Sequence, residues 1–368
     1  MGGTERKYVE QAFADNWIVP LGPNVDEFEH RLEQFLDVDN VVALSAGTAA
    51  IHLGLVMLGV GKGDEVICQS LTFSASANPV RYCGAEPVFV DSEAETWNMD
   101  PDRLEEAIID RKRVTGRYPK AIIPVYLYGM PANIDKILAI ADKYDIPVLE
   151  DSAEALGSEY KGRKCGTYGK YGALSFNGNK IITTSGGGAL ICPDKESADR
   201  VKFYATQARE NRPYYYHEVI GYNYRLSNVS AGIGCGQMEV LEAHLARRRE
   251  IHGLYSALLA DVPGVTVHEN PTKDYNSNFW LTTILLDPEV IATTPDELRI
   301  ALNEANIESR LIWRPMHMQP VYASNPYYGG KISETIFDRG LCLPSGSSLT
   351  DDDIRRVAET LRANITLR

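Results

Sequence analysis

Lys180 is the residue whose setting most clearly suggests chemistry. It lies between two short apolar segments, residues 173–176 and 189–191, in a stretch rich in threonine, serine and glycine. We expect the two segments to be buried strands of one hairpin. A desolvated amine in such a place can give up its proton and attack a carbonyl carbon. Most lysines are solvated surface charges, so this interpretation depends on suitable partners elsewhere in the chain.

A candidate phosphate site lies early in the chain. Ser45-Ala-Gly-Thr48 follows a short apolar strand, residues 41–44, and opens an expected helix. Free backbone N–H groups at a helix N-terminus attract phosphate and other anions. The segment lacks the spacing of a P-loop, and serine and threonine are also common helix caps. It is therefore compatible with a phosphate cradle or with an ordinary cap.

Two further candidates follow strand ends. Asp151 ends the apolar segment 146–150, so we expect a buried carboxylate that needs a cation or hydrogen-bond donors. It fits either a cap for the next turn or a partner for the protonated ring nitrogen of an electron-sink cofactor. Phe73 fits either a core aromatic or a cover for the face of such a ring.

Combined, these groups meet the requirements of pyridoxal 5′-phosphate (PLP). The phosphate would bind at the cradle and at Ser175, and the pyridinium would pair with Asp151. The aldehyde would form a Schiff base, the internal aldimine, with Lys180. PLP is therefore the cofactor that the residues favour.

The elements that must position these groups alternate between strand and helix. Apolar strands separated by amphipathic helices predict an α/β fold with a parallel sheet covered on both faces. Ligands in such folds bind at the carboxyl ends of the strands, where the candidate residues lie. The expected strands are residues 41–44, 64–69, 87–91, 121–125 and 147–150, and the expected helices are residues 25–36, 73–83, 101–110 and 133–144.

In the second half of the chain, strands and helices no longer alternate in the same regular order. Residues 207–228 are too polar for a core and too aromatic for a linker, so we expect them to pack on another surface, such as a second subunit. A long helix is expected over residues 226–259, followed by a strand over 280–286 and helices over 294–303 and 351–364. We place a domain boundary near residue 245, which gives a large domain, residues 1–245, and a small domain, residues 246–368.

Composition excludes several classes of protein. The 368 residues carry a net charge of −13, which argues against nonspecific binding to nucleic acid or to an anionic membrane. No segment has the apolar length of a signal peptide or a membrane span. The six cysteines are scattered without a C-x-x-C pair, which favours reduced core thiols in a cytoplasmic protein over a metal site or a disulfide framework.

Five motifs in order give the chain a family resemblance. It resembles the sugar aminotransferases of the DegT/DnrJ/EryC1/StrS family over essentially its whole length. The resemblance implies the fold-type-I PLP architecture: a large domain with a mostly parallel seven-stranded sheet between helices, and a smaller C-terminal α+β domain. The motifs are Ser45-Ala-Gly-Thr-Ala-Ala50, Asp151-Ser-Ala-Glu154, Ser175-Phe-Asn-Gly-Asn-Lys180, Gly221-Tyr-Asn-Tyr-Arg225 and Arg314-Pro-Met-His-Met-Gln-Pro-Val-Tyr322.

The resemblance also implies roles for single residues. Lys180 would hold PLP and carry protons, and Asn223 would reach the cofactor phosphate of a neighbouring subunit, which makes the active unit a homodimer. Glu154 departs from the His or Gln of many members and would approach the phenolic oxygen of PLP. The remaining cofactor contacts would come from Gly47, Thr48 and Ser175 to the phosphate, Asp151 to the ring nitrogen and Phe73 to the ring face.

Substrates follow from the same resemblance. Glu154, the Asn177-Gly-Asn179 turn and the Pro-Met-His-Met-Gln-Pro run look most like 4-aminotransferases that make UDP-4-amino sugars of the bacillosamine type. The amino donor would be L-glutamate and the acceptor UDP-2-acetamido-2,6-dideoxy-hexos-4-ulose. Four residues could contact glutamate or the nucleotide diphosphate, although each fits a surface ion pair equally well. They are Arg225, Arg310, Arg314 and His317.

Other functions remain open at this point. A GDP-perosamine synthase or a dTDP-linked 4-amino-4,6-dideoxyhexose aminotransferase would share the fold. A dehydratase of the family is disfavoured because such members replace the lysine with His. A non-catalytic PLP-binding regulator is disfavoured by the intact set of Lys180, Asp151 and Thr48, and a Rossmann dehydrogenase by the lack of an early G-x-G-x-x-G motif.

Overall fold

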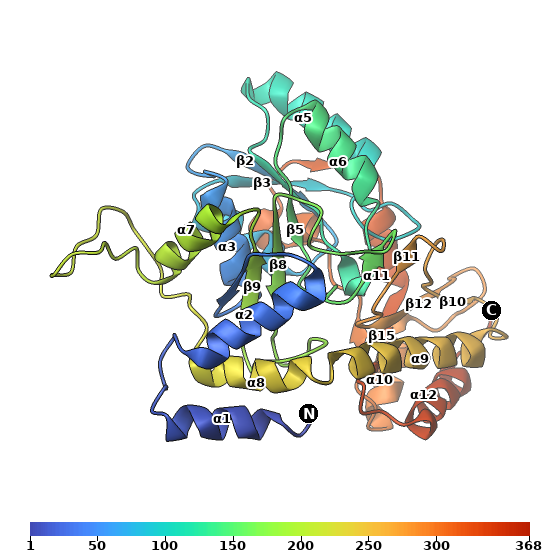
Figure 1. Cartoon of the computed structure of the whole chain (residues 1–368). Helices are drawn as coiled ribbons and strands as arrows, with labels where there is room; N and C mark the ends of the chain where they lie inside the picture. Colours follow the sequence, from blue (N-terminus) through green and yellow to red (C-terminus); the bar gives the residue numbers. More distant parts are fainter.

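A central sheet organises most of the chain, and the computed structural model describes all residues 1–368 (Figure 1). Two four-stranded sheets join where the parallel bridges Ile122–Val148 and Val125–Asp151 connect them. In spatial order the strands are β1 (Val41–Leu44), β9 (Gly188–Ile191), β8 (Tyr171–Ser175), β5 (Leu149–Asp151), β4 (Ala121–Ile123), β2 (Glu65–Gln69), β3 (Glu86–Val90) and β14 (Tyr327–Tyr328).

One strand of this sheet is reversed. β9 runs antiparallel to β1 and to β8, whereas the other neighbouring pairs are parallel. The predicted mostly parallel sheet of seven strands is therefore confirmed, and the short β14 extends it at one edge. β8 and β9 form the expected hairpin, in which residues 176–187 connect the two strands and carry Lys180.

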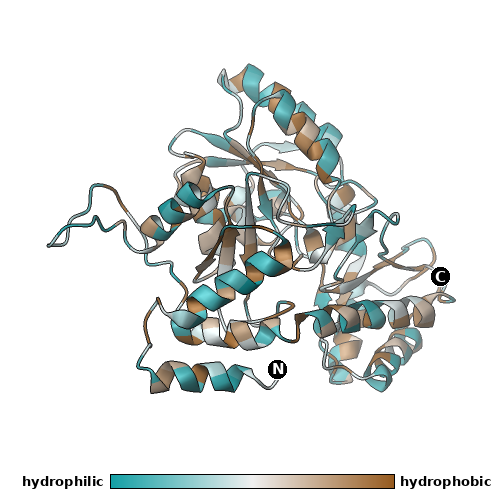
Figure 2. Ribbon diagram, viewed as in Figure 1, coloured by the Kyte–Doolittle hydropathy of each residue, from teal (hydrophilic) through white to brown (hydrophobic).

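Helices cover both faces of the sheet because successive strand side chains point to opposite sides. Val41 and Ala43 pack in one core and Val42 and Leu44 in the other. Figure 2 shows apolar strands in the centre, with helices that are polar on their outer sides. On one face lie α2 (Pro23–Leu36), α8 (Asn228–Met238), α5 (Pro101–Thr115) and α6 (Ile134–Lys143), and on the other α3 (Gly47–Met57), α4 (Asn78–Tyr82) and α7 (Lys195–Ala205).

The C-terminal part has its own sheet and core. An antiparallel sheet packs against three helices around a core that contains Ile251, Ile284 and Leu341. The strands are β10 (Val265–Val267), β12 (Thr282–Leu286), β15 (Gly340–Leu343) and β13 (Arg310–Leu311), and the helices are α9 (Leu241–Leu259), α10 (Pro295–Glu304) and α12 (Asp351–Asn364). A small sheet of β6 (Glu159–Tyr160), β7 (Arg163–Lys164) and β11 (Tyr275–Asn276) ties this part to the central sheet.

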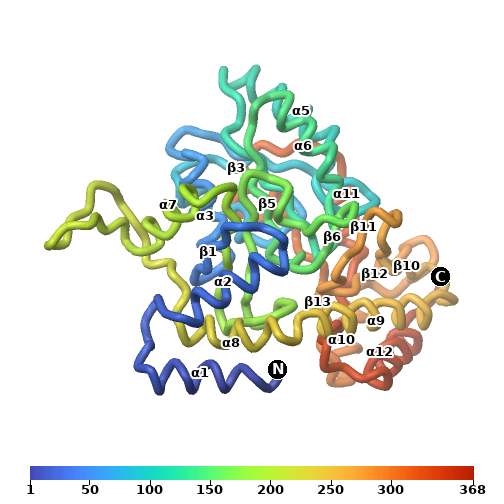
Figure 3. The backbone as a smooth tube through the Cα atoms, in the orientation of Figure 1, coloured from blue at the N-terminus to red at the C-terminus, as the bar shows by residue number.

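α9 connects the two parts without interruption (Figure 3). Leu245 packs in a core shared with the central sheet, and Ile251, six residues further along, packs in the C-terminal core. The proposed domain boundary near residue 245 thus falls inside a continuous helix and stays a prediction.

The prediction of one helix over residues 226–259 is wrong. The structure has two helices, α8 and α9, and a turn in which the N–H of Val240 donates to the carbonyl of Gln237 at 3.2 Å separates them. Cys235 and Leu241 pack in the same core, but in an unbroken helix they would point about 120° apart. The turn brings both side chains to the same side, and residues 237–241 contain neither proline nor glycine that would mark it in the sequence.

A long excursion leaves the body of the protein between α7 and α8 and projects sideways (Figure 1). It carries aromatic and aliphatic side chains into solvent: Tyr215 is 77% exposed and Ile220 83%. Residues 17–21, after α1 (Glu5–Ala14), add exposed apolar side chains. No helix of the structure combines the length and apolar character needed to cross a membrane.

Candidate active site

A cavity of ≈ 290 Å³ lies where the carboxyl ends of four strands of the central sheet meet. These are β1, β2, β5 and β8, as expected for ligand sites in parallel sheets. Its only cationic lining residue is Lys180. The structure brings these predicted site residues to the cavity wall: Gly47, Thr48, Phe73, Asp151, Glu154, Ser175 and Lys180.

The N-terminus of α3 opens onto this cavity. Ala46 at the N-cap offers no side-chain cap, and the N–H groups of Gly47, Thr48 and Ala49 have no acceptor within the chain. A Cβ atom on Gly47 would lie 2.9 Å from Cβ of Ser175, so only glycine leaves the space between them free. Uncapped N–H groups beside a serine hydroxyl fit a phosphate group, and the cap interpretation left open by the sequence has no hydrogen bond to support it.

Asp151 is buried at the end of β5. Its carboxylate accepts hydrogen bonds from Ser76 Oγ at 2.6 Å and from the N–H of Ala153 at 3.2 Å. Burial raises the pKa of Asp151, although these hydrogen bonds and the charge of Lys180 lower it. A buried carboxylate with its pKa raised by desolvation gains from a further cation, and a protonated ring nitrogen would supply one.

Glu154 lies between Lys180 and a backbone donor. Its Oε2 accepts from the N–H of Tyr128 at 2.6 Å, and its Oε1 lies 3.5 Å from Lys180 Nζ. Burial raises the pKa of Glu154 to about 7, the charge of Lys180 opposes this shift, and the charge of Asp151 adds to it. Its carboxyl group can therefore be protonated or ionised near neutral pH.

Glu154→Gln is expected to stabilise the cofactor-free protein at alkaline but not at acidic pH. The folded chain holds the Glu154 proton more tightly than the unfolded chain, whose pKa is near 4.5. Stability is therefore lost as the pH rises from that value through about 7, and glutamine avoids the loss because it stays neutral. Thermal unfolding should show a melting temperature raised by about 2–4 °C near pH 8 and unchanged near pH 4.

Glu159→Gln is the matched control, because the ion pair with Lys164 lowers the pKa of that carboxylate. It should lower or leave unchanged the melting temperature near neutral pH. A difference in melting temperature between Glu154→Gln and wild type that did not vary with pH would contradict the proposed ionisation of Glu154.

Aromatic side chains missed by the sequence reasoning complete the cavity. Trp280 and Trp313 both line it. Trp313 packs against Phe73, with ring centroids 5.4 Å apart, and against Tyr128 at 5.0 Å. Trp280 was expected at the start of a strand but precedes β12 in a loop. Flat apolar walls of this kind suit the C–H faces of sugars or bases.

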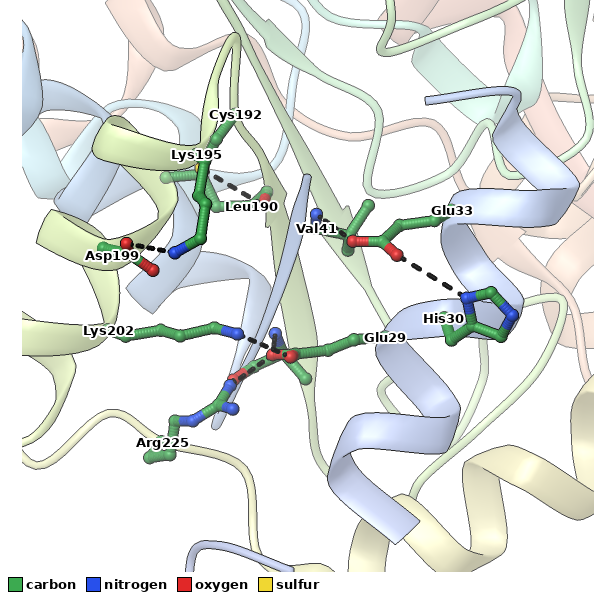
Figure 4. Close-up of polar contacts among 11 residues, drawn as sticks. Glu29, His30, Glu33, Val41, Leu190, Cys192, Lys195, Asp199, Lys202 and Arg225 are labelled. Atoms are coloured by element: carbon green, nitrogen blue, oxygen red, sulfur yellow. Dashed lines mark hydrogen bonds and ion pairs between the residues drawn. The ribbon is translucent and has the colours of Figure 1, made fainter. Parts of the chain in front are cut away.

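Two of the four candidate substrate residues have structural partners away from the cavity. Figure 4 shows Arg225 in an ion pair with the buried Glu29, which also binds Lys202 Nζ at 2.9 Å. His317 Nδ1 lies 2.7 Å from Ser70 Oγ, and its ring stacks on Tyr327. Neither side chain lines the cavity, and the ion pair of Arg225 is buried rather than on the surface, so a contact of Arg225 or His317 with substrate stays a prediction.

The other candidates lie on the surface. Arg310 pairs with Glu308, while Arg314 is exposed, makes no ion pair and directly follows Trp313 of the cavity wall. Asn223 does not line the cavity of its own chain, and its Oδ1 accepts from Gln207 Nε2 at 3.2 Å. Asn223 is thus placed away from the cavity of its own chain, and its contact with the cofactor of a neighbouring subunit stays a prediction.

A lysine in the β8–β9 loop, opposite a buried aspartate at the end of β5, is the arrangement of a fold-type-I PLP-dependent aminotransferase. The chain belongs to the DegT/DnrJ/EryC1/StrS aminotransferase family, whose model matches residues 1–362. The crystal structure of a DegT DnrJ EryC1 StrS aminotransferase from Brucella abortus superposes with a TM-score of 0.90 at 31% identity, covering 98% of this chain and 94% of that one. The predicted fold, enzyme class and cofactor are thereby confirmed.

Two curated relatives match over nearly the full length. EpsN of Bacillus subtilis (strain 168), whose name describes a pyridoxal phosphate-dependent aminotransferase, is 47% identical over 98% of this chain and 93% of its own. The GDP-perosamine synthase of Caulobacter vibrioides is 39% identical over 98% of this chain and 95% of its own.

Proposed function

We propose that the protein transfers the amino group of L-glutamate to C4 of a nucleotide-linked 4-keto-6-deoxy sugar, in the cytoplasm, for polysaccharide or glycoprotein synthesis. The observation that carries this proposal is the position of Lys180 Nζ, which lies 3.5 Å from Glu154 and faces the same cavity as Asp151 and the open end of α3. Bound PLP supplies the electron sink that stabilises the substrate carbanion.

The chain's own groups have separate tasks in this reaction. Lys180 takes the proton from the carbon that bears the amino group and delivers it to the cofactor carbon bonded to the same nitrogen. Its amine is assigned this task because it is the only base at the cavity wall besides the two carboxylates. Asp151 keeps the cofactor ring nitrogen protonated, and the N–H groups of Gly47 and Thr48 hold the phosphate. Trp280 and Trp313 form an apolar part of the cavity wall and exclude water from it.

A UDP-linked acceptor, UDP-2-acetamido-2,6-dideoxy-hexos-4-ulose, is our first candidate, on the strength of Glu154 and the turn before Lys180. A GDP-linked 4-keto-6-deoxy sugar is the second, supported by the 39% identity to a GDP-perosamine synthase. dTDP-linked sugars come third. The choice among nucleotides depends on cavity contacts outside PLP, so it is decided by direct assay.

The test is a panel of UDP-, GDP- and dTDP-linked 4-keto sugars, each incubated with the PLP-loaded enzyme and L-glutamate. Mass spectrometry and proton NMR should detect a 4-amino sugar and 2-oxoglutarate with one nucleotide preferred. Reactions without glutamate are the control. PLP binding without amine transfer to any of these sugars would instead favour the regulator alternative.

We further propose a homodimer in which Asn223 of one subunit reaches the PLP phosphate of the other. The projecting residues 207–221 support it, since exposed tyrosines and Ile220 suit an interface better than solvent. None of these residues lines the cavity of its own chain, which is also consistent with a shared site.

Mixed dimers test this sharing. Asn223→Ala and Lys180→Ala subunits, carrying different tags, are co-expressed and the mixed dimer is purified. In a shared site the Lys180→Ala subunit lends its intact Asn223 to the partner, so the mixed dimer should regain about half of the wild-type activity per dimer. If Asn223 acts within its own chain, the mixed dimer will show no more activity than the mean of the two parent variants.

A further inference from the structure

The loop before β12 brings an aromatic ring onto the reacting amine. Trp280 is 2% exposed, and its ring centroid lies 4.0 Å from Lys180 Nζ. Its indole Nε1 donates to the carbonyl of Asn179 at 2.7 Å, next to Lys180 in the chain. One side chain from the C-terminal part therefore contacts both the lysine amine and the backbone that carries it.

Asn278 holds this tryptophan and Glu154 in one arrangement. Asn278 is fully buried, and its Oδ1 accepts from the N–H of Trp280 at 2.8 Å. Its Nδ2 donates to the carbonyls of Glu154 at 2.8 Å and Leu156 at 2.9 Å. The buried Arg248 of α9 donates to the carbonyl of Trp280. Every polar backbone atom of Trp280 is thus bound, so the ring has little freedom to leave Lys180.

The surroundings of Lys180 Nζ explain why an aromatic face matters there. The other charged groups that face it are two carboxylates, Glu154 at 3.5 Å and the more distant Asp151, and both attract an ammonium group. The indole face also attracts a cation but cannot accept its proton. The indole can therefore bind the protonated amine without drawing it into an ion pair with either carboxylate.

We propose that Trp280 is a further catalytic residue, which orients the Lys180 amine by holding it against the indole face when the amine carries a proton, and that Asn278 is the positioning residue that aligns Trp280 with Glu154. The proposal rests on the aminotransferase assignment of this site and not on the identity of the sugar. It implies that the C-terminal part of the chain controls the proton carrier itself, in addition to shaping the cavity.

Trp280→Leu and Trp280→Phe separate the aromatic face from the Nε1 donor. With PLP bound at Lys180, the visible absorption of the cofactor is titrated with pH in the absence of any sugar. Loss of the cation–π contact in Trp280→Leu should lower the pH midpoint by about one unit, because the protonated nitrogen of Lys180 loses its aromatic neighbour. Trp280→Phe should keep most of the wild-type midpoint.

Kinetics provide the second readout. Trp280→Leu should lower kcat by about 10–100-fold with KM for the amino donor within about twofold. Asn278→Ala should shift the midpoint in the same direction, less strongly, since the ring remains but is held by fewer bonds. Trp313→Leu is the matched control: Trp313 lines the same cavity, but the aromatic face over which Lys180 Nζ lies belongs to Trp280, so KM should rise and the midpoint stay unchanged.

Three outcomes would overturn the proposal. One is a midpoint in folded Trp280→Leu equal to that of wild type, and another is an equal shift in Trp313→Leu. The third is a midpoint in Trp280→Phe as low as in Trp280→Leu, which would assign the effect to the Nε1 bond. If Trp280→Leu fails to fold, Asn278→Ala is compared with Trp313→Leu instead, and the absence of a shift of the midpoint in Asn278→Ala then overturns the proposal. The titration needs no sugar, so a wrong choice of substrate in the proposed function cannot produce these results.

Discussion

Lys180→Ala is expected to abolish amine transfer, with a loss of turnover of about 10⁴-fold or more, because the variant has neither the covalent anchor for PLP nor the proton carrier. Initial rates with glutamate and the preferred keto sugar measure the effect. Borohydride reduction of the PLP-loaded protein, followed by intact mass measurement, should add one cofactor to the wild type and none to the variant.

Lys170→Ala is the control for a lost positive charge, since Lys170 is exposed and lies outside the cavity. It should retain the wild-type rate and the cofactor adduct. Substantial turnover or a reducible adduct in Lys180→Ala would place the Schiff-base lysine elsewhere.

Asp151→Asn is expected to have the second largest effect, a fall in kcat of about 10²–10³-fold. Asparagine has the same shape and can still accept the hydrogen bond from Ser76, but it carries no charge to keep the ring nitrogen protonated. The cofactor should remain bound, because Lys180 and the cradle at α3 are unchanged. Steady-state kinetics and the absorption spectrum of the bound cofactor test both statements.

Ser76→Ala provides the comparison for Asp151→Asn, since it removes one donor to the carboxylate and leaves its charge. We expect a loss of roughly tenfold or less. An Asp151→Asn variant no slower than Ser76→Ala would show that the carboxylate has a structural role, the capping alternative left open by the sequence.

The part of the cavity built by the central sheet was predictable from sequence. Apolar strands followed by helices indicate a parallel sheet, and the carboxyl ends of parallel strands meet at one edge. Ser45–Thr48, Asp151 and Ser175 could therefore be placed together without knowledge of any contact. The position of Lys180 could also be predicted, because the two strands on either side of it, β8 and β9, are short, apolar and close in sequence.

The remainder depends on contacts between distant segments. Asn278 binds the backbone carbonyls of Glu154 and Leu156 and so helps to place Trp280 beside Lys180, and no local pattern reveals such a bond. The same holds for Arg225, whose partner Glu29 lies 196 positions away in the chain. An arginine that neutralises a buried glutamate and one that binds a diphosphate look alike in sequence, because both need only a nearby anion.

The continuous α9 has a mechanical consequence for this enzyme. The helix has 19 residues and is anchored by side chains in both cores, so the C-terminal part cannot swing away from the central sheet without bending it. Trp280 and Trp313 belong to the C-terminal part of the chain, whereas Lys180 lies in the β8–β9 loop of the central sheet. We therefore expect the distance between these tryptophans and Lys180, and with it the width of the cavity, to stay nearly fixed while the two substrates bind one after the other. For the two substrates proposed above, glutamate and a bulkier nucleotide sugar, the differences in size would then be accommodated by side-chain rotation at the rim of the cavity.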